Sequence, residues 1–311
     1  MSPDELTAEK CRVAICICTY RRPAVIEHLL QELRSVIRDA SAVADVHIVV
    51  VDDDANESAR GAVESQAGQV EWPISYVVSG SGNISTARNT AVAEGIRVAD
   101  FLALIDDDCV PHHDWLRQLV AVQQRYGSDI VSGYCIDVAP EGAPRWFVDE
   151  PFFTPHTPMD DGASIDNGAL KNTLLDASAI RRYNLGFDES YGRTGGEDSM
   201  FFYTTAHLGL SHRFASAAVV EERVPPDRAT LRYQLRRALW YGNTEATTSI
   251  ASGRHTRARI AMSSVKRIAF APARPIRRLV TGNSSEWRYG LCDFLAGWGR
   301  LIGAFGIRLH H

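Results

Sequence analysis

The first half of the sequence alternates short apolar segments with segments of helical periodicity, and this alternation restricts the fold more than any other feature. Predicted buried strands, rich in aliphatic and β-branched residues, lie at 12–18, 47–51, 74–78, 101–105 and 130–138. Predicted helices between them lie at 23–38, 85–98 and 115–126. Such alternation favours an α/β domain with a mostly parallel sheet, which binds ligands beyond the carboxyl ends of its strands.

Three consecutive carboxylates, Asp106, Asp107 and Asp108, directly follow the predicted strand 101–105. An acidic triplet in a solvated loop would need no function, but here it stands at the expected ligand edge. Like charges this close repel one another unless a cation or hydrogen-bond donors neutralise them. We therefore predict that Asp108 binds Mg²⁺ or Mn²⁺, and that Asp106 contacts a ribose or a water bound to the metal.

Polar residues also follow the first two predicted strands. Thr19 and Tyr20 come after the first strand, and Asp52 and Asp53 end the second. The acids could simply cap neighbouring backbone N–H groups in a turn. Because the two strand ends are expected to be adjacent, the hydroxyls and carboxylates are also suited to bind a nucleoside base and ribose.

Two further segments carry candidate site residues. Arg88 and Asn89 lie in the first turns of a predicted helix that follows a glycine turn, where an anionic or planar ligand is favoured over a routine surface role. Glu197 and Asp198 follow two glycines at a predicted helix start. Acids there commonly complement the helix dipole, but a carboxylate can also act as a general base. We assign that role to Asp198, with Glu197 as the alternative.

Charge is distributed unevenly along the chain. Residues 1–222 contain 17 Lys and Arg against 34 Asp and Glu, whereas residues 223–311 contain 16 against 4. We predict a catalytic domain over 1–222 and an Arg-rich helical region over 223–311. The basic region would face an anionic partner, such as the acidic domain, a lipid surface or nucleic acid.

Arg228, Arg232 and Arg236 recur at helical spacing in the basic region. They could form a solvated face, bind a diphosphate leaving group or contact anionic lipid. Nothing nearby resembles a base-reading module, so no nucleic-acid partner is expected. The sequence shows neither a signal-peptide pattern nor a run long enough to cross a bilayer, and its six cysteines lack metal spacing. We expect a cytoplasmic protein with reduced thiols, which could lie peripherally on the membrane's cytoplasmic face.

Six segments together resemble the family 2 glycosyltransferases, which have the GT-A fold and include bacterial exopolysaccharide and cell-surface glycan enzymes. They share the family's order and spacing: 18–23, 50–53, 82–89, 101–108, 186–189 and 195–198. The resemblance covers about residues 11–220. It implies a Rossmann-like nucleotide-binding sheet and an inverting hexosyl transfer from a nucleotide-sugar, most often UDP-linked, to a glycan or lipid-linked acceptor.

The resemblance also implies roles for individual residues. Thr19 and Asp53 would contact the nucleotide base, supported by Arg88, and the 18–23 segment adds Tyr20 and Arg22 to the donor site. Asp106 and Asp108 would be the outer members of the family's DxD motif, binding ribose and the metal-diphosphate. Asp198 would be the base.

The sequence departs from the family late in the domain. Many relatives have a histidine near the metal or diphosphate, where residues 219–223 read Val-Val-Glu-Glu-Arg. The role of this histidine could be taken by Glu222, by His207 or His212, or by the arginines of the basic region. Two alternative functions make predictions that the sequence does not meet. A sugar nucleotidyltransferase predicts a glycine-rich phosphate loop, which 19–23 lacks, and an inactive glycan-binding or scaffold subunit predicts lost carboxylates, whereas every expected acidic position is filled.

Overall fold

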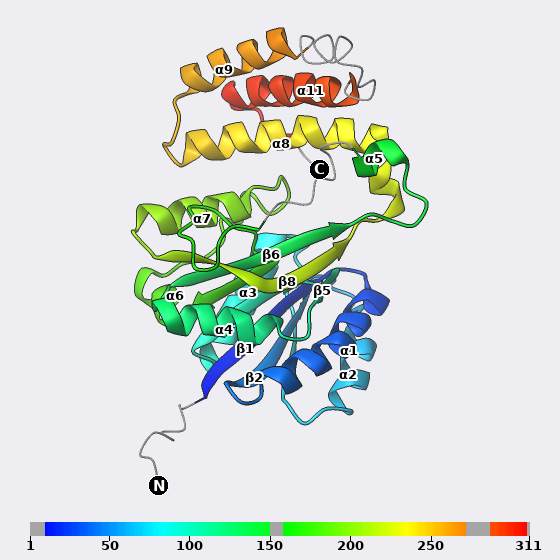
Figure 1. Ribbon diagram of the computed structural model, residues 1–311, viewed down its shortest axis with the longest axis vertical. Helices are drawn as coiled ribbons and strands as arrows, with labels where there is room; N and C mark the ends of the chain where they lie inside the picture. The colour runs from blue at the N-terminus through cyan, green and yellow to red at the C-terminus, as the bar shows by residue number, and fades with distance from the viewer. Residues whose placement is uncertain (1–9, 150–157, 272–286, 310–311) are drawn as a thin grey trace. The chain divides into compact units, whose positions relative to one another are not determined.

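The computed structural model describes residues 10–149, 158–271 and 287–309 (Figure 1). It divides into two compact units. Of the described residues, the first contains 10–136, 158–189 and 201–222, and the second contains 137–149, 190–200, 223–271 and 287–309. The second unit thus takes two segments from the range in which the sequence predicts the catalytic domain.

The first unit is built on an eight-stranded sheet of order β3-β2-β1-β4-β7-β6-β8-β5. The strands are β1 (Cys11–Thr19), β2 (Ala44–Asp52), β3 (Ile74–Val78), β4 (Phe101–Asp106), β5 (Cys109–Pro111), β6 (Ile130–Val138), β7 (Asn172–Asp176) and β8 (His212–Arg223). The pairs β1-β2, β2-β3 and β1-β4 are parallel, as the alternation predicts. The pairs β4-β7, β6-β7 and β5-β8 are antiparallel.

Helices alternate with the parallel strands and complete the predicted α/β domain. Those that end before residue 208 are α1 (Pro23–Ala40), α2 (Arg60–Ala67), α3 (Ile84–Val98), α4 (Trp115–Tyr126), α5 (Arg145–Asp149), α6 (Ala177–Tyr183) and α7 (Glu197–His207). Pro23 begins α1 at a position that tolerates its missing N–H. Asn83 caps α3 by accepting hydrogen bonds from the backbone N–H groups of Ser85 and Thr86.

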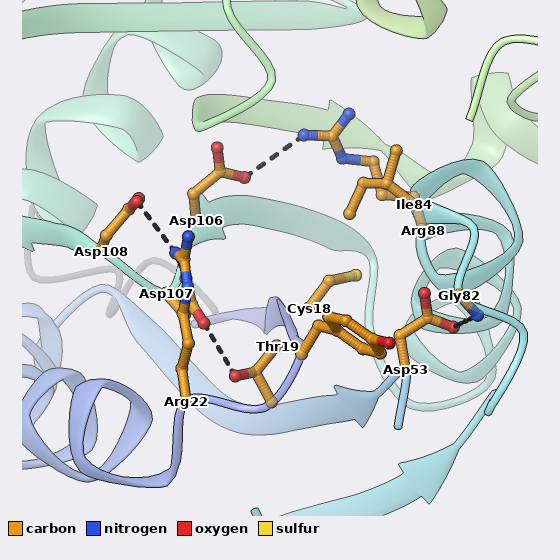
Figure 2. Close-up of a pocket in the computed structure, with 11 residues that line it drawn as sticks. Cys18, Thr19, Arg22, Asp53, Gly82, Ile84, Arg88, Asp106, Asp107 and Asp108 are labelled. Carbon is orange, nitrogen blue, oxygen red and sulfur yellow. Dashed lines mark hydrogen bonds and ion pairs between the residues drawn. The ribbon is translucent and has the colours of Figure 1, made fainter. Parts of the chain in front are cut away.

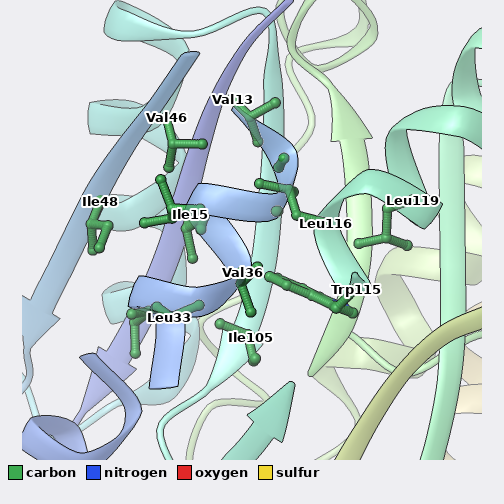
Figure 3. Packing of buried hydrophobic residues seen from close by; sticks show 14 of the residues in the cluster. Val13, Ile15, Leu33, Val36, Val46, Ile48, Ile105, Trp115, Leu116 and Leu119 are labelled. Atoms are coloured by element: carbon green, nitrogen blue, oxygen red, sulfur yellow. The ribbon is translucent and has the colours of Figure 1, made fainter. Parts of the chain in front are cut away.

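Both faces of the central strand β1 are buried. Val13 and Ile15 pack with residues of α1 and α4, including Leu33 and Trp115 (Figure 3). Ala14 and Cys16 belong to a second cluster, with residues of α3. Because side chains alternate across a strand, the two clusters cover opposite faces of the sheet. This explains why the segment reads as a continuous apolar run rather than an alternating one.

A buried asparagine joins the antiparallel strands to α4. The side chain of Asn172, on β7, accepts a 2.7 Å hydrogen bond from the indole N–H of Trp115. Its amide nitrogen donates to the carbonyl oxygens of Tyr134 and Ala218, at 3.0 and 2.9 Å. Asn172 is fully buried, and each of these bonds satisfies a polar atom that would be costly to leave unpaired.

The described C-terminal helices of the second unit are α8 (Leu231–Ala251), α9 (Arg257–Phe270) and α11 (Trp287–Ala304), preceded by the short 3₁₀ helix η2 (Pro226–Ala229). The helices α8 and α11 approach closely at glycines. A Cβ atom on Gly299 would lie 2.0 Å from the carbonyl oxygen of Leu239, and one on Gly242 would lie 2.1 Å from that of Ala296. Within the described ranges, no helix is long and apolar enough to span a bilayer.

Candidate active site

A pocket of about 400 Å³ opens at the carboxyl ends of the parallel strands (Figure 2). Its walls come from the β1-α1 loop, the ends of β2 and β4, and the start of α3. The lining residues are Cys18, Thr19, Tyr20, Arg22, Asp53, Gly82, Ile84, Arg88, Asp106, Asp107 and Asp108. The edge that the alternation of strands and helices predicts for ligands is therefore the edge that contains the pocket.

The turn after β3 holds the Asp53 carboxylate in place. Oδ1 of Asp53 accepts hydrogen bonds from the hydroxyls of Ser79 and Ser81, at 2.7 and 2.8 Å. It also accepts from the backbone N–H groups of Ser81 and Gly82, at 3.0 and 3.1 Å. Gly80 and Gly82 have positive φ angles of 58° and 59°, which glycine adopts without strain. Asp53 is thereby a fixed negative charge in the pocket wall.

The neighbouring Asp52 faces its own loop and is not among the pocket residues. Its Oδ1 accepts from the backbone N–H of Asp54 at 2.9 Å. Its Oδ2 accepts from the backbone N–H of Ala59 at 2.7 Å and from the Tyr76 hydroxyl at 2.8 Å. Asp52 is fully buried. These bonds make it an anchor for the segment between β2 and α2.

The middle carboxylate of the acidic triplet is tied to the β1-α1 loop. Asp107 accepts a 2.7 Å hydrogen bond from the Thr19 hydroxyl and a 3.1 Å bond from the Arg22 guanidinium. The same Arg22 nitrogen lies 3.1 Å from Oδ2 of Asp108. Burial raises the pKa of Asp107 above its ordinary value, although Thr19 and Arg22 act in the opposite direction.

Asp106 is paired with Arg88, which α3 carries into the pocket. The guanidinium of Arg88 lies 3.3 Å from Oδ1 of Asp106 and 6.0 Å from the ring centroid of Phe187. Burial raises the pKa of the adjacent Cys18 thiol to about 12, so this residue is neutral at physiological pH. The Asp106 side chain remains 39% exposed and can therefore meet a ligand.

The Asn89 side chain binds the backbone of the 186–189 segment and does not line the pocket. Its Oδ1 accepts a 2.7 Å hydrogen bond from the Phe187 backbone N–H, and its Nδ2 donates to the Phe187 carbonyl oxygen at 2.9 Å. This two-way bond fixes the 186–189 segment beneath Arg88. Tyr20 does line the pocket and is 45% exposed, with the guanidinium of Arg21 4.9 Å from its ring centroid.

Lys171, which precedes β7, is a charged residue near this edge that no sequence motif predicts. Its ammonium group forms an ion pair with Glu222 of β8. In the β5-β8 ladder, Glu222 stands opposite Cys109, the residue that follows Asp108. Burial alone would lower the pKa of Lys171, but Cys135 and Glu222 outweigh it and raise that pKa. Two antiparallel pairings bring these residues to this edge: Asn172, next to Lys171, pairs with Ile105 of β4, and Glu222 pairs with Cys109 of β5.

The structure places neither candidate histidine at the position of Glu222. His212 begins β8, and ten residues of extended strand separate it from Glu222 by about 33 Å. It is buried, stacks on Phe202 with 5.1 Å between ring centroids, and lies 2.8 Å from the Ser132 hydroxyl. His207 is exposed at the end of α7.

The candidate base lies in the first turn of α7, in a segment that belongs to the second unit. Glu197 and Asp198 are both half-buried there. The preceding Gly196 has a φ angle of 103°, and a Cβ on it would lie 2.7 Å from a methyl group of Thr248. Glycine is therefore required at the turn that presents the two acids.

Two arginines of the basic region, Arg232 and Arg236, line a second cavity in the second unit, and Arg228 is not among its lining residues. Arg228 lies in η2, and Arg232 and Arg236 lie on α8. The cavity measures about 310 Å³ and is lined by Asp227, Thr230, Arg232, Tyr233, Arg236 and Trp240. The Arg236 guanidinium stacks over the Trp240 ring, 5.3 Å from its centroid.

The first pocket has the composition of a site for a divalent cation and an anionic ligand. Four carboxylates and two arginines line it, so its formal charge is negative before any ligand enters. A nucleoside diphosphate, itself an anion, would be repelled unless a cation accompanied it. No group of three His, Cys, Asp or Glu residues in the described chain is arranged to hold a metal. The carboxylates of Asp106 and Asp108 fit a cation that takes its other ligands from phosphates and water.

Comparison with known proteins confirms the family that the motifs indicate. The model of glycosyl transferase family 2 matches residues 14–185. The succinoglycan biosynthesis protein ExoM of Rhizobium meliloti (strain 1021) is 33% identical over 241 residues, which cover 76% of this chain and 74% of ExoM.

Solved structures share the fold. The mannosyltransferase PcManGT from Pyrobaculum calidifontis, in complex with GDP-Man and Mn²⁺, superposes with a TM-score of 0.62 at 17% identity, covering 95% of this chain and 88% of its own. S. aureus TarS 1-349 in complex with UDP gives 0.53 at 15% identity, covering 95% and 91%. This chain spans 43% of a longer TarS structure. The chain therefore belongs to glycosyl transferase family 2 and is a glycosyltransferase of the GT-A fold.

Proposed function

We propose that the protein is an inverting, metal-dependent glycosyltransferase that moves a sugar from a nucleotide-sugar to a hydroxyl of a glycan or lipid-linked acceptor. The observation that carries this proposal is the pocket at the ends of β1, β2 and β4. There Asp53, Asp106 and Asp108 each have a donor that fixes the carboxylate: the 79–82 turn, Arg88 and Arg22. The relative ExoM supports an acceptor in exopolysaccharide synthesis.

A UDP-sugar is the proposed donor. TarS structures hold UDP and UDP-GlcNAc, whereas the PcManGT structure holds GDP-Man. In the proposed complex, Asp53 accepts a hydrogen bond from a base N–H, beside Thr19 and Tyr20. Asp106 binds ribose hydroxyls and is kept in place by Arg88, its ion-pair partner.

Asp106 and Asp108 would hold Mg²⁺ or Mn²⁺, which when bound would offset the negative charge of the departing diphosphate. The chain's own cations add to this effect. Arg22, which is paired with Asp108, stands next to the proposed phosphate position, and Arg228, Arg232 and Arg236 are proposed to contact the leaving group.

Asp198 is the proposed general base. It takes the proton of the acceptor hydroxyl while the hydroxyl oxygen forms a bond to the anomeric carbon. The bond between that carbon and the phosphate oxygen breaks, and the nucleoside diphosphate leaves. A single displacement of this kind inverts the anomeric configuration.

The test is a panel of UDP- and GDP-sugars, assayed for transfer or hydrolysis with Mg²⁺, with Mn²⁺ and with EDTA. We expect activity with a UDP-sugar that EDTA abolishes, and a loss of at least about 100-fold in Asp108→Ala. Asp198→Asn should lose about 100-fold or more, and Glu197→Gln less. Full activity in EDTA would contradict the metal dependence, and a larger loss in Glu197→Gln would move the base to Glu197.

We further propose that the C-terminal helices bind an anionic membrane surface. On α9, Met262, Val265 and Phe270 are exposed beside Arg259 and Lys266. An apolar face flanked by basic residues is suited to the interface of anionic lipids. Co-sedimentation with phosphatidylglycerol vesicles at low salt should exceed that with phosphatidylcholine, and Phe270→Glu should reduce it. Equal binding to both lipids would contradict the proposal.

A further inference from the structure

The turn 194–196, which precedes the two acids of α7, contacts a buried tyrosine and the helix α8 within the second unit. The carbonyl oxygen of Tyr191 accepts hydrogen bonds from the backbone N–H groups of the first two residues of this turn, at 3.0 and 2.8 Å. A Cβ on Gly196 would lie 3.4 Å from the Tyr191 ring and 2.7 Å from a methyl group of Thr248, on α8. Tyr191 is 2% exposed. A shift of Tyr191 would therefore shift the turn that presents the two acids.

A buried asparagine on α8 binds the segment that follows α11. Gly306, with a φ angle of 85°, turns the chain after the helix, as glycine commonly does there. Nδ2 of Asn243 donates a 2.9 Å hydrogen bond to the Ile307 carbonyl oxygen, and its Oδ1 accepts one of 2.9 Å from the Leu309 backbone N–H. Asn243 is 2% exposed, so water competes little for these bonds. They fix the backbone on either side of Arg308.

The Arg308 side chain reaches the segment that precedes the turn. Its guanidinium carbon lies 4.3 Å from the centroid of the Tyr191 ring. Its Nη1 donates to the carbonyl oxygen and to the hydroxyl of Ser190, at 3.3 and 3.2 Å. A planar guanidinium can stack on a ring and donate hydrogen bonds from its edge at the same time. Because Arg308 is exposed, these contacts restrain Tyr191 locally and contribute little to the stability of the whole protein.

We propose that Arg308 is a positioning residue for catalysis: it holds Tyr191, and through Tyr191 it holds the turn that aims the α7 acids at the acceptor hydroxyl. This inference rests on the proposed general base, Asp198. A base takes a proton only within hydrogen-bond distance, and a displacement of about 1 Å can cost about 100-fold in rate. The residues of the donor pocket belong to the first unit. Loss of Arg308 should therefore slow turnover and leave nucleotide binding intact.

Two substitutions of Arg308 and a matched control distinguish this role from a general loss of structure. Arg308→Met keeps a long unbranched side chain but removes the guanidinium. Arg308→Lys keeps a positive charge that can stack on the ring, and it should restore part of the lost function. Arg182→Met, on α6 of the first unit, makes the same change at an exposed arginine whose guanidinium lies 6.0 Å from the ring centroid of Tyr183.

Hydrogen exchange of the full chain tests the contact without any substrate. Peptides that contain residues 190–200 should exchange at least about threefold faster in Arg308→Met than in the wild type, and at an unchanged rate in Arg182→Met. Unchanged exchange in Arg308→Met would overturn the inference, because the turn would then not depend on Arg308.

Kinetics test the catalytic consequence, by hydrolysis of the UDP-sugar that gives the highest turnover in the donor panel, and calorimetry measures UDP affinity with Mn²⁺. We expect Arg308→Met to lower kcat at least about tenfold and to keep UDP affinity within about twofold of the wild type. Added to Asp198→Asn, Arg308→Met should cause no further fall, because both changes act through the same base.

Three kinetic results would each overturn the inference: an unchanged kcat in Arg308→Met, a loss of UDP affinity as large as the loss of kcat, or a full loss that persists in the Asp198→Asn background. If Asp198→Asn and Glu197→Gln both retain full activity, the proposed base falls and the inference falls with it. The single variants of the two acids thus separate the two failures.

Discussion

The hydroxyl of Thr19 donates a 2.7 Å hydrogen bond to the carboxylate of Asp107, and this bond separates the middle acid of the triplet from its neighbours. Asp107 is 7% exposed and is also bound by Arg22. Asp106 and Asp108 are more exposed, at 39% and 25% of their side chains. The three acids therefore divide into one that holds the β1-α1 loop against β4 and two that remain available to a ligand.

Asp107→Asn should change how stability depends on pH. Burial raises the pKa of Asp107 in the folded protein, so the folded state binds its proton more readily than the unfolded state does. The wild type should be most stable relative to Asp107→Asn below the ordinary Asp pKa, and should lose this advantage as pH rises through the raised pKa. Urea unfolding of both proteins between about pH 3 and about pH 7 measures the difference. A difference that grows with pH would contradict the assignment.

Substitution of Asp52 should lower stability, whereas substitution of the adjacent Asp53 should weaken donor binding. Asp53→Asn retains an amide oxygen for the four donors of the 79–82 turn but loses the charge, so we expect about a tenfold rise in the donor KM with little change in stability. Asp52→Asn places an NH₂ group against a donor, because both oxygens of Asp52 accept hydrogen bonds. It should cost about 1 to 3 kcal/mol of stability and leave KM unchanged.

Steady-state kinetics together with thermal unfolding of the two variants test this division. The pair serves as its own control, because the residues are adjacent and the chemical change is identical. If Asp52→Asn raised KM as much as Asp53→Asn, Asp52 would have to contact the donor directly.

Local patterns in the sequence predict the parallel part of the fold and most of the pocket. The apolar run from Phe101 to Ile105 predicts a buried strand, and acids follow it. Because neighbouring parallel strands end at the same edge of a sheet, Thr19, Asp53 and Asp106 are expected to lie together there. The antiparallel part has no comparable signal. The pairing of Cys109 with Glu222 joins residues far apart in the sequence, so the ion pair between Glu222 and Lys171 cannot be predicted from periodicity.

The same distinction explains residues that stand in the right segment but serve the fold. Asn89 and Asp52 lie in matched motifs, and both are engaged by backbone groups of neighbouring loops. A sequence motif indicates that a residue type is needed at a position. It does not indicate whether the side chain contacts a ligand or binds the protein's own backbone.

His212 should make the protein sensitive to acid. Burial lowers the pKa of His212 to about 4, so the folded state favours the neutral imidazole. The stability that depends on this neutral form is complete above the ordinary histidine pKa, and is lost as pH falls from about 6.5 toward 4. The lowered pKa corresponds to a loss on the order of 3 kcal/mol across this range. His212→Gln should flatten the dependence, whereas the exposed His113→Gln should retain it. Parallel profiles for the wild type and His212→Gln would contradict the assignment.

The contact between α8 and α11 predicts a strong effect of one methyl group. In Gly299→Ala the added Cβ would lie 2.0 Å from the Leu239 carbonyl oxygen, a backbone atom that cannot rotate away. The two helices must separate, at an expected cost of about 1 to 3 kcal/mol or more. In Gly61→Ala, on α2, the added methyl group meets nothing within 4 Å, and the change should be neutral or stabilise by up to about 1 kcal/mol. Thermal unfolding with native-state hydrogen exchange of α8 and α11 measures both. Unchanged protection of these helices in Gly299→Ala would show that they do not pack this closely.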